Sequence, residues 1–160
     1  MFLLFRASEH GYRSSSFHKH CDGKGPTITL VKADNGRIAA FYSGVAWPKV
    51  VRGSTIFPLN PRGFIASIKD VKGKYTFKKY SATSAAYVVS FFDQGPCFGR
   101  ALWLNDQCQL NEDSRSYLFS EYWYDLKGVD GSLILFGAKK IKVLEYEVYQ
   151  VEQEGRWNYI

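Results

Sequence analysis

The residues that could form a nucleophilic site stand near the start of the chain. Ser8 and His10 are two positions apart, and Ser8 or a serine of residues 14–16 could be combined with a histidine and a carboxylate as a triad. Triads depend on geometry, however, and the chain has no Gly-x-Ser-x-Gly elbow to expose a nucleophile. We therefore treat Ser8 and His10 as an alternative catalytic pair and favour a protein without enzymatic activity.

The three cysteines offer a second kind of chemistry. Cys21, Cys97 and Cys108 include no Cys-x-x-Cys pair, and an odd number is typical of free thiols in a reducing compartment. Cys97 follows a Gly-Pro dipeptide and stands close to Arg100, so the sequence predicts a loop in which this thiol is accessible. Cys97 is thus the best candidate for a thiol antioxidant, the alternative to a binding function.

Metal binding is considered at His18, His20 and Cys21. On a helix His18 and Cys21 are about one turn apart, but His20 points elsewhere. No second group of ligands completes the tetrahedral set that zinc prefers. We expect no metal and no cofactor.

The densest basic and aromatic segment covers residues 69–80. Its lysines alternate with Tyr75, Phe77 and Tyr80, a composition that could bind single-stranded nucleic acid by stacking and phosphate contacts. An edge strand explains the pattern better, with aromatic rings turned inward and lysines turned outward against aggregation. We therefore expect no nucleic-acid partner.

Composition and charge indicate one soluble domain. The chain has 160 residues, of which 46% are hydrophobic and 17% aromatic, and its apolar runs are too short to cross a membrane. No secretory signal is evident, so we expect a cytoplasmic protein without membrane insertion. Residues 1–100 hold 15 of the 21 basic and 5 of the 15 acidic side chains, so they carry +10 and the remainder −4. Such a field can steer an acidic partner.

Short strand-like runs punctuated by turn residues dominate the chain. Asn35-Gly36 between two such runs predicts a hairpin with a type I′ turn, in which both residues have positive φ. Ser14–Cys21 is predicted to be a helix, capped by Ser14, with Phe17 and Cys21 on one face. The fold class expected is a two-sheet antiparallel β-sandwich with short peripheral helices. The predicted strands are 27–32, 37–43, 55–59, 64–69, 75–80, 86–92, 101–104, 117–119, 132–136 and 141–151.

Several dispersed segments resemble, in the same order, the motifs of the TLDc domain, the TBC/LysM-associated domain of oxidation-resistance proteins. The resemblance covers almost the whole chain, with the domain at 1–151 and a polar tail at 152–160. It implies a role in oxidative-stress protection and, as in several members, association with the vacuolar proton-pumping ATPase, at whose membrane the protein would be peripheral. The resembling segments are 4–12, 17–21, 25–32, 41–47, 95–99, 102–105 and 144–151.

The chain departs from the family pattern beside two of these motifs. Pro48 and Lys49 stand where members often have an acidic residue after the tryptophan, and Arg100 stands where many have further glycines. The helical segment that usually precedes the first motif is missing, which suggests a divergent member or a fragment of a longer chain. The residues expected to bind a protein partner are Trp47, Lys49, Arg52 and Arg100.

Overall fold

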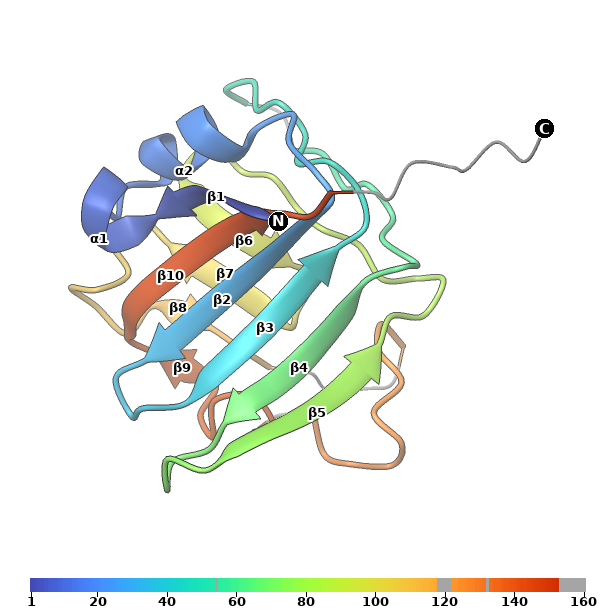
Figure 1. Cartoon of the computed structure of the whole chain (residues 1–160). Helices are drawn as coiled ribbons and strands as arrows, with labels where there is room; N and C mark the ends of the chain where they lie inside the picture. The colour runs from blue at the N-terminus through green and yellow to red at the C-terminus, as the bar shows by residue number, and fades with distance from the viewer. Residues whose placement is uncertain (54, 118–121, 132, 153–160) are drawn as a thin grey trace.

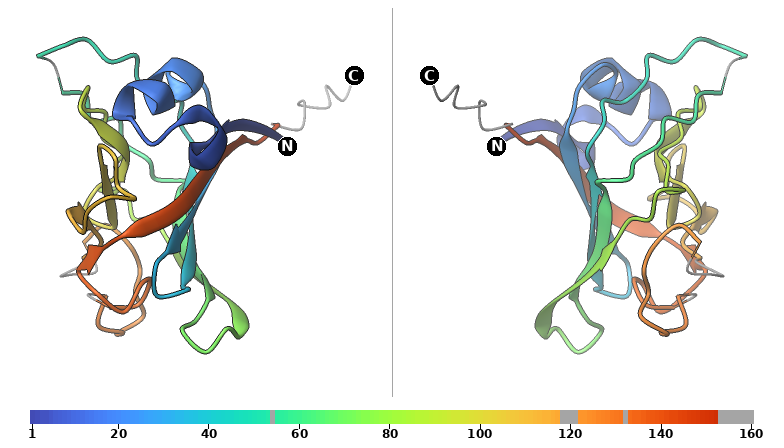
Figure 2. Two further views of the ribbon diagram at one scale, coloured as in Figure 1. Left: turned by 90° about the vertical axis from the view of Figure 1, so that its left-hand side faces the viewer. Right: turned by 90° about the vertical axis from the view of Figure 1, so that its right-hand side faces the viewer.

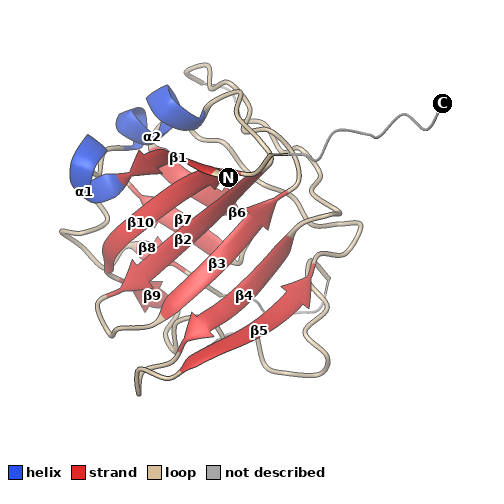
Figure 3. Ribbon diagram, viewed as in Figure 1, coloured by secondary structure: helices blue, strands red, loops and turns tan. Residues whose placement is uncertain are grey.

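In the part of the chain that the structure describes, the protein is a sandwich of two antiparallel sheets with two short helices at one end (Figures 1 and 3). The computed structural model describes residues 1–53, 55–117, 122–131 and 133–152. The predicted fold class is confirmed. The polar tail expected at 152–160 lies outside the described residues except for its first position.

The larger sheet has six strands in the order β1-β10-β2-β3-β4-β5. The two ends of the chain meet in it, because β1 pairs with β10 and β10 with β2. Tyr146 and Val148 of β10 lie opposite Val31 and Thr29 of β2, and all four side chains are buried. Every second residue of these strands thus faces the core, as expected of a half-buried sheet. The strands are β1 (Phe2–Arg6), β2 (Thr27–Ala33), β3 (Ile38–Ser43), β4 (Phe64–Lys69), β5 (Tyr75–Ser81) and β10 (Val143–Gln150).

The smaller sheet lies behind the larger one and has the order β6-β7-β8-β9. Its strands are β6 (Gln94–Phe98), β7 (Leu102–Asn105), β8 (Ser114–Arg115) and β9 (Lys140–Ile141). The predicted strand 141–151 is therefore two strands, which belong to different sheets. The loop predicted around Cys97 is wrong as well, because residues 94–98 pair with β7.

Other predicted strands are only partly present. Segments 55–59 and 86–92 meet through isolated bridges, Ile56 with Ser90 and Leu59 with Tyr87, and form no continuous ladder. The prediction for 117–119 falls mostly on residues outside the described part of the chain, and Tyr117 itself is not in a strand. Residues 133–136 form turns in which Leu135 and Phe136 are buried.

The hairpin between β2 and β3 is present, but its turn differs from the prediction. Gly36 has φ 84°, whereas Asn35 is not among the residues with positive φ. The Gly36 N–H donates to Ala33 O, and the Ala33 N–H donates to Arg37 O. This is a three-residue loop in which one glycine in the left-handed region closes the turn.

The helices α1 (Ala7–His10) and α2 (Ser14–Cys21) cover one end of the sandwich. Phe17 and Cys21 of α2 are fully buried, as predicted. Ser14 is not the cap, however, because Arg13 occupies the N-cap position and the Ser14 N–H donates to Asp106 Oδ1 at 2.6 Å. No helix among the described residues is long and apolar enough to cross a bilayer.

Candidate interaction surface

The first candidate site is the Ser8 and His10 corner on α1. His10 Nδ1 accepts the Arg6 N–H at 3.0 Å, and the His10 ring packs against the His20 ring at 4.3 Å between centroids. The ring nitrogen that would act as a base is thus engaged with the backbone. Ser8 is exposed, and its own N–H donates to Glu145 Oε1 at 3.2 Å. The contacts of these residues support the local fold of α1 and do not form a triad.

The cysteines lie in the core. Cys21, Cys97 and Cys108 are buried free thiols, so the expected exposure of Cys97 is wrong. Cys97 Sγ donates to Gly95 O at 3.4 Å inside the smaller sheet. Burial raises the pKa of Cys108 to about 12 and the pKa values of Cys21 and Cys97 further. The reactive thiolate is therefore disfavoured at all three positions.

His18 connects α2 to two loops. Its Nδ1 lies 2.8 Å from Asp22 Oδ1, and its Nε2 lies 2.7 Å from Phe91 O and 2.9 Å from Gln94 O. Asp22 Oδ2 in turn accepts the Val50 N–H at 3.0 Å. His18 therefore has a structural role. Across the described part of the chain, no three His, Cys, Asp or Glu side chains gather as metal ligands.

Trp47 belongs to the core, although the sequence interpretation placed it in a binding surface. Its ring is 1% exposed and meets Phe17 and Phe98 edge-on, each at 5.3 Å between centroids. It cannot present its ring to a partner without unfolding. The buried Trp47 ring instead attaches the loop that follows it to the sandwich.

Residues 48–53 and 55–59 are called the basic loop, which carries Lys49 and Arg52. Its start is fixed by the bond from the Gly23 N–H to Trp47 O at 2.7 Å and by the Val50 bond to Asp22. Its far end is fixed where the Ser90 and Val88 N–H groups donate to Ile56 and Pro58 carbonyls. Lys49 and Arg52 are both exposed on this anchored loop.

An aromatic band continues from the basic loop across the surface. It consists of Phe57, Tyr87, Trp123 and Tyr122, and each ring contacts the next at 5.8, 6.5 and 5.4 Å between centroids. Phe57 is 55% exposed and Tyr122 66%. The band therefore offers aromatic rings to solvent on both sides of partly buried Tyr87 and Trp123.

Arg100 lies at the far end of the same band. Its guanidinium stands over the Trp123 ring at 5.6 Å and over the Tyr117 ring at 5.9 Å. Tyr87, packed beside Gly99, links this arginine to Phe57 on the basic loop. The rings thus link Arg100 to Phe57 of the basic loop, which also carries exposed Lys49 and Arg52, whereas Trp47 is buried.

The band residues themselves were missed by the sequence interpretation. Phe57 and Tyr87 fall in segments that were taken for ordinary strands, where an aromatic residue suggests core. Pro58 was the available signal, because a proline inside a strand-like run indicates an edge or an irregular segment. Nothing local in the sequence distinguishes Trp123 from a core tryptophan.

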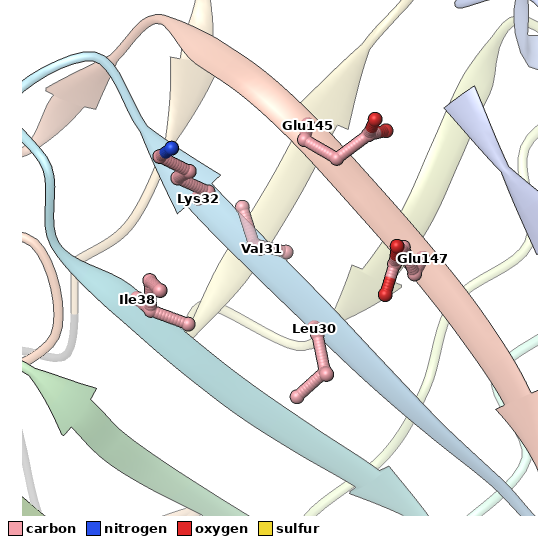
Figure 4. Close-up of a pocket in the computed structure, with 6 residues that line it drawn as sticks. All are labelled: Leu30, Val31, Lys32, Ile38, Glu145 and Glu147. Carbon is pink, nitrogen blue, oxygen red and sulfur yellow. The ribbon is translucent and has the colours of Figure 1, made fainter. Parts of the chain in front are cut away.

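A depression lies on the outer face of the larger sheet (Figure 4). Its volume of about 200 Å³ is below the roughly 300–1,000 Å³ of typical ligand pockets. Glu147 accepts bonds from Arg6 Nε and the Tyr149 hydroxyl, at 2.6 and 2.7 Å. Glu145 Oε1 accepts the Ser8 and Tyr146 N–H groups. Both carboxylates are thus engaged within the fold, and the depression offers no catalytic pair.

Comparison with known proteins gives one family. A family model described as the TLDc domain matches residues 1–152. TBC1 domain family member 24 from Xenopus laevis is 38% identical to the chain over 45 residues. The matched segment is 28% of this chain and 8% of that protein, so it spans only a small part of the relative.

Proposed function

From the premise that the chain belongs to the TLDc domain family, we propose that it is a protein-interaction module and not an enzyme. The module takes part in protection from oxidative stress, and its partner is a subunit of the vacuolar proton-pumping ATPase. It works in the cytoplasm and reaches the vacuolar, endosomal or lysosomal membrane through this partner. Family membership supports the oxidation-resistance type of function, and the surface supports binding.

The observation that carries the proposal is the row of contacts from Phe57 through Tyr87 to Trp123, with Arg100 over its end. Tryptophan, tyrosine and arginine dominate the binding energy of protein interfaces, because they bury a large area and still make polar contacts. The band is anchored by backbone bonds at the basic loop. An anchored surface loses less conformational entropy on binding than a free loop.

The charges beside the band define the kind of partner. Lys49 and Arg52 are exposed on the loop that carries Phe57, and Arg100 is exposed over Trp123, so an acidic protein surface fits this region. Since Lys49 occupies a place where the family often has an acidic residue, this member would favour a more acidic partner surface than its relatives. The replacement of an acidic residue by Lys49 would thus mainly change which partner the module selects.

The alternative is an antioxidant that acts through its own thiol. Oxidation requires an accessible thiolate, and Cys97 is buried with its pKa raised by desolvation. The engaged His10 nitrogen argues in the same way against hydrolysis at Ser8. The binding proposal therefore fits the described side chains better than either kind of turnover.

Co-precipitation of the full chain with the pump tests the proposal. We expect the wild type to bring down pump subunits and the double variant Lys49→Glu/Arg52→Glu to lose them. The matched control is Lys72→Glu/Lys74→Glu, which changes the charge equally at exposed positions at the opposite end of the molecule (Figure 1). The proposal fails if Cys97→Ser abolishes oxidative protection in cells while Lys49→Glu/Arg52→Glu leaves both protection and pump association intact.

A further inference from the structure

Strands β4 and β5 with their turn, residues 64–81, form a lysine hairpin at one edge of the larger sheet. The hairpin turns away from the smaller sheet and extends beyond the body of the sandwich (Figure 2). Its tip lies at the end of the molecule opposite the basic loop (Figure 1). It is therefore a separate surface from the one proposed for the protein partner.

The charge of this hairpin is strongly one-sided. Asp70 is its sole acidic residue, and Asp70 Oδ1 accepts the N–H groups of Lys72 and Lys74 at 2.9 and 3.0 Å. The Asp70 carboxylate thus stabilises the turn. Its single negative charge offsets only a small part of the positive charge of the surrounding lysines. The lysines of the hairpin are Lys69, Lys72, Lys74, Lys78 and Lys79.

Apolar side chains stand exposed among these lysines. Val71 is 55% exposed, Tyr75 69% and Phe77 67%. The sequence interpretation, with aromatic rings turned inward, holds for Tyr80 and is wrong for Tyr75 and Phe77. Tyr75 and Phe77 stand five and three positions before Tyr80, so regular strand alternation does not place the three rings on one face.

Protection of a sheet edge does not account for this arrangement. Lysines alone prevent edge-to-edge pairing, whereas exposed aromatic and aliphatic side chains promote it. The combination of a polybasic patch with exposed Val71, Tyr75 and Phe77 matches a surface that adsorbs to anionic lipid. Lysines meet the lipid phosphates there, and aromatic rings settle among the headgroups.

Single-stranded nucleic acid is a poorer match to the same residues. Base stacking needs free ring faces, and Lys69 Nζ lies 5.1 Å from the Tyr75 centroid. An exposed valine such as Val71, next to the tip, would contribute nothing to a phosphate-binding groove. In a bilayer it would be buried at the boundary between the headgroups and the acyl chains. The hairpin also projects outward, and a strand-tracking groove would be hollow.

We propose that the lysine hairpin binds directly to the surface of an anionic lipid bilayer. Val71, Tyr75 and Phe77 enter the headgroup region, and the five lysines contact lipid phosphates. The hairpin adsorbs without crossing the bilayer. This contact is independent of the protein partner, and the two surfaces lie far enough apart to act together.

Co-sedimentation of the full chain with vesicles tests the proposal. Vesicles of equal parts phosphatidylcholine and phosphatidylserine should pellet the wild type, and pure phosphatidylcholine should not. Lys72→Glu/Lys74→Glu should lower the partition coefficient about tenfold or more. Tyr75→Ser/Phe77→Ser should also lower it, with the thermal midpoint of each variant measured to show that it is folded. Lys49→Glu/Arg52→Glu is the control with the same change of charge.

Each result is decisive. Loss of binding in both hairpin variants, with binding kept in the control, supports the proposal. Equal losses in the hairpin and control reversals would overturn it, because they show attraction by net charge alone. The proposal also fails if a single-stranded oligonucleotide displaces the vesicles and Tyr75→Ser/Phe77→Ser leaves lipid binding unchanged.

Discussion

Trp47 Nε1 donates a hydrogen bond to Thr27 Oγ1 at 3.0 Å, and both residues are almost fully buried. The bond joins Trp47, which lies between β3 and the basic loop, to the first residue of β2. It satisfies the polar atom of the indole, so that a large aromatic ring can occupy the core beside Phe17 and Phe98. Trp47 thus fixes the start of the basic loop against the core.

Removal of either partner of this bond should lower stability. Thr27→Val leaves the indole N–H buried without an acceptor, and we expect a loss of about 1–3 kcal/mol in the free energy of unfolding. Trp47→Phe should cost at least as much, because it also leaves a cavity. Urea denaturation measures both, with exposed Lys49→Ala as a control that should stay within about 0.5 kcal/mol of the wild type. An unchanged free energy of unfolding in Thr27→Val would contradict this hydrogen bond.

The N-terminus of α2 gives a second test, because its cap comes from another segment. Asp106 Oδ1 accepts the Ser14 N–H at 2.6 Å, whereas Arg13, the N-cap residue, makes no side-chain capping bond. Asp106→Ala should cost about 1–2 kcal/mol, and Asp106→Asn, which keeps the acceptor, should cost less. Ser14→Ala should be milder than Asp106→Ala in the same urea titration. The reverse order would restore the local cap expected from the sequence.

The sequence was sufficient for the fold where the signal is local. Alternation and turn residues located β4 at 64–69 with the observed bounds, and helical spacing located α2 at 14–21. Strands β1 and β6 were missed, because β1 exists only by pairing with the distant β10, and β6 reads as a Gly-Pro loop. The cap of α2 was missed for the same reason, since residues 14 and 106 meet only after folding.

The candidate surface was harder to predict than the fold. Lys49, Arg52 and Arg100 are exposed as a binding residue must be, but sequence alone could not show that Trp47 and Cys97 are buried. A loop motif beside an arginine suggested an accessible thiol. Tertiary pairing of β6 with β7 removed that access. Exposure depends on what covers a residue, and that is a long-range property.

The turn of the first hairpin provides a third prediction. Gly36 has φ 84°, and a Cβ at this position would meet no atom within 4 Å, so the cost of substitution comes from the backbone and not from a clash. Gly36→Val should destabilise the domain by about 1 kcal/mol or more. Gly36→Asn should cost less, because asparagine tolerates the left-handed region. Equal urea midpoints for the wild type and Gly36→Val would contradict this turn.

The buried thiols predict a loss of stability in alkali. Burial raises the pKa of Cys108 to about 12, from the roughly 8.5 of an exposed cysteine. Between these values the unfolded chain releases a proton that the folded chain keeps. The free energy of unfolding is therefore unaffected below about pH 8.5 and falls above it, by about 1.4 kcal/mol per pH unit for each such thiol. Urea titrations at rising pH measure the slope, and Cys108→Ala should make it shallower; an unchanged slope would contradict the burial of this thiol.

The last prediction separates the roles of charge and aromatic contact at the proposed protein interface. Exposed Lys49 and Arg52 steer the encounter, so Lys49→Glu/Arg52→Glu should mainly lower the association rate constant, by about tenfold at low salt and less at high salt. Phe57 is an exposed ring at one end of the band and packs on Tyr87, so the partner would bury it, and Phe57→Ser should mainly raise the dissociation rate constant. Surface plasmon resonance with immobilised peripheral subunits of the pump measures both rates at two salt concentrations. If Phe57→Ser left dissociation unchanged while Lys72→Glu/Lys74→Glu accelerated it, the protein-binding surface would have to be moved from the aromatic band to the lysine hairpin.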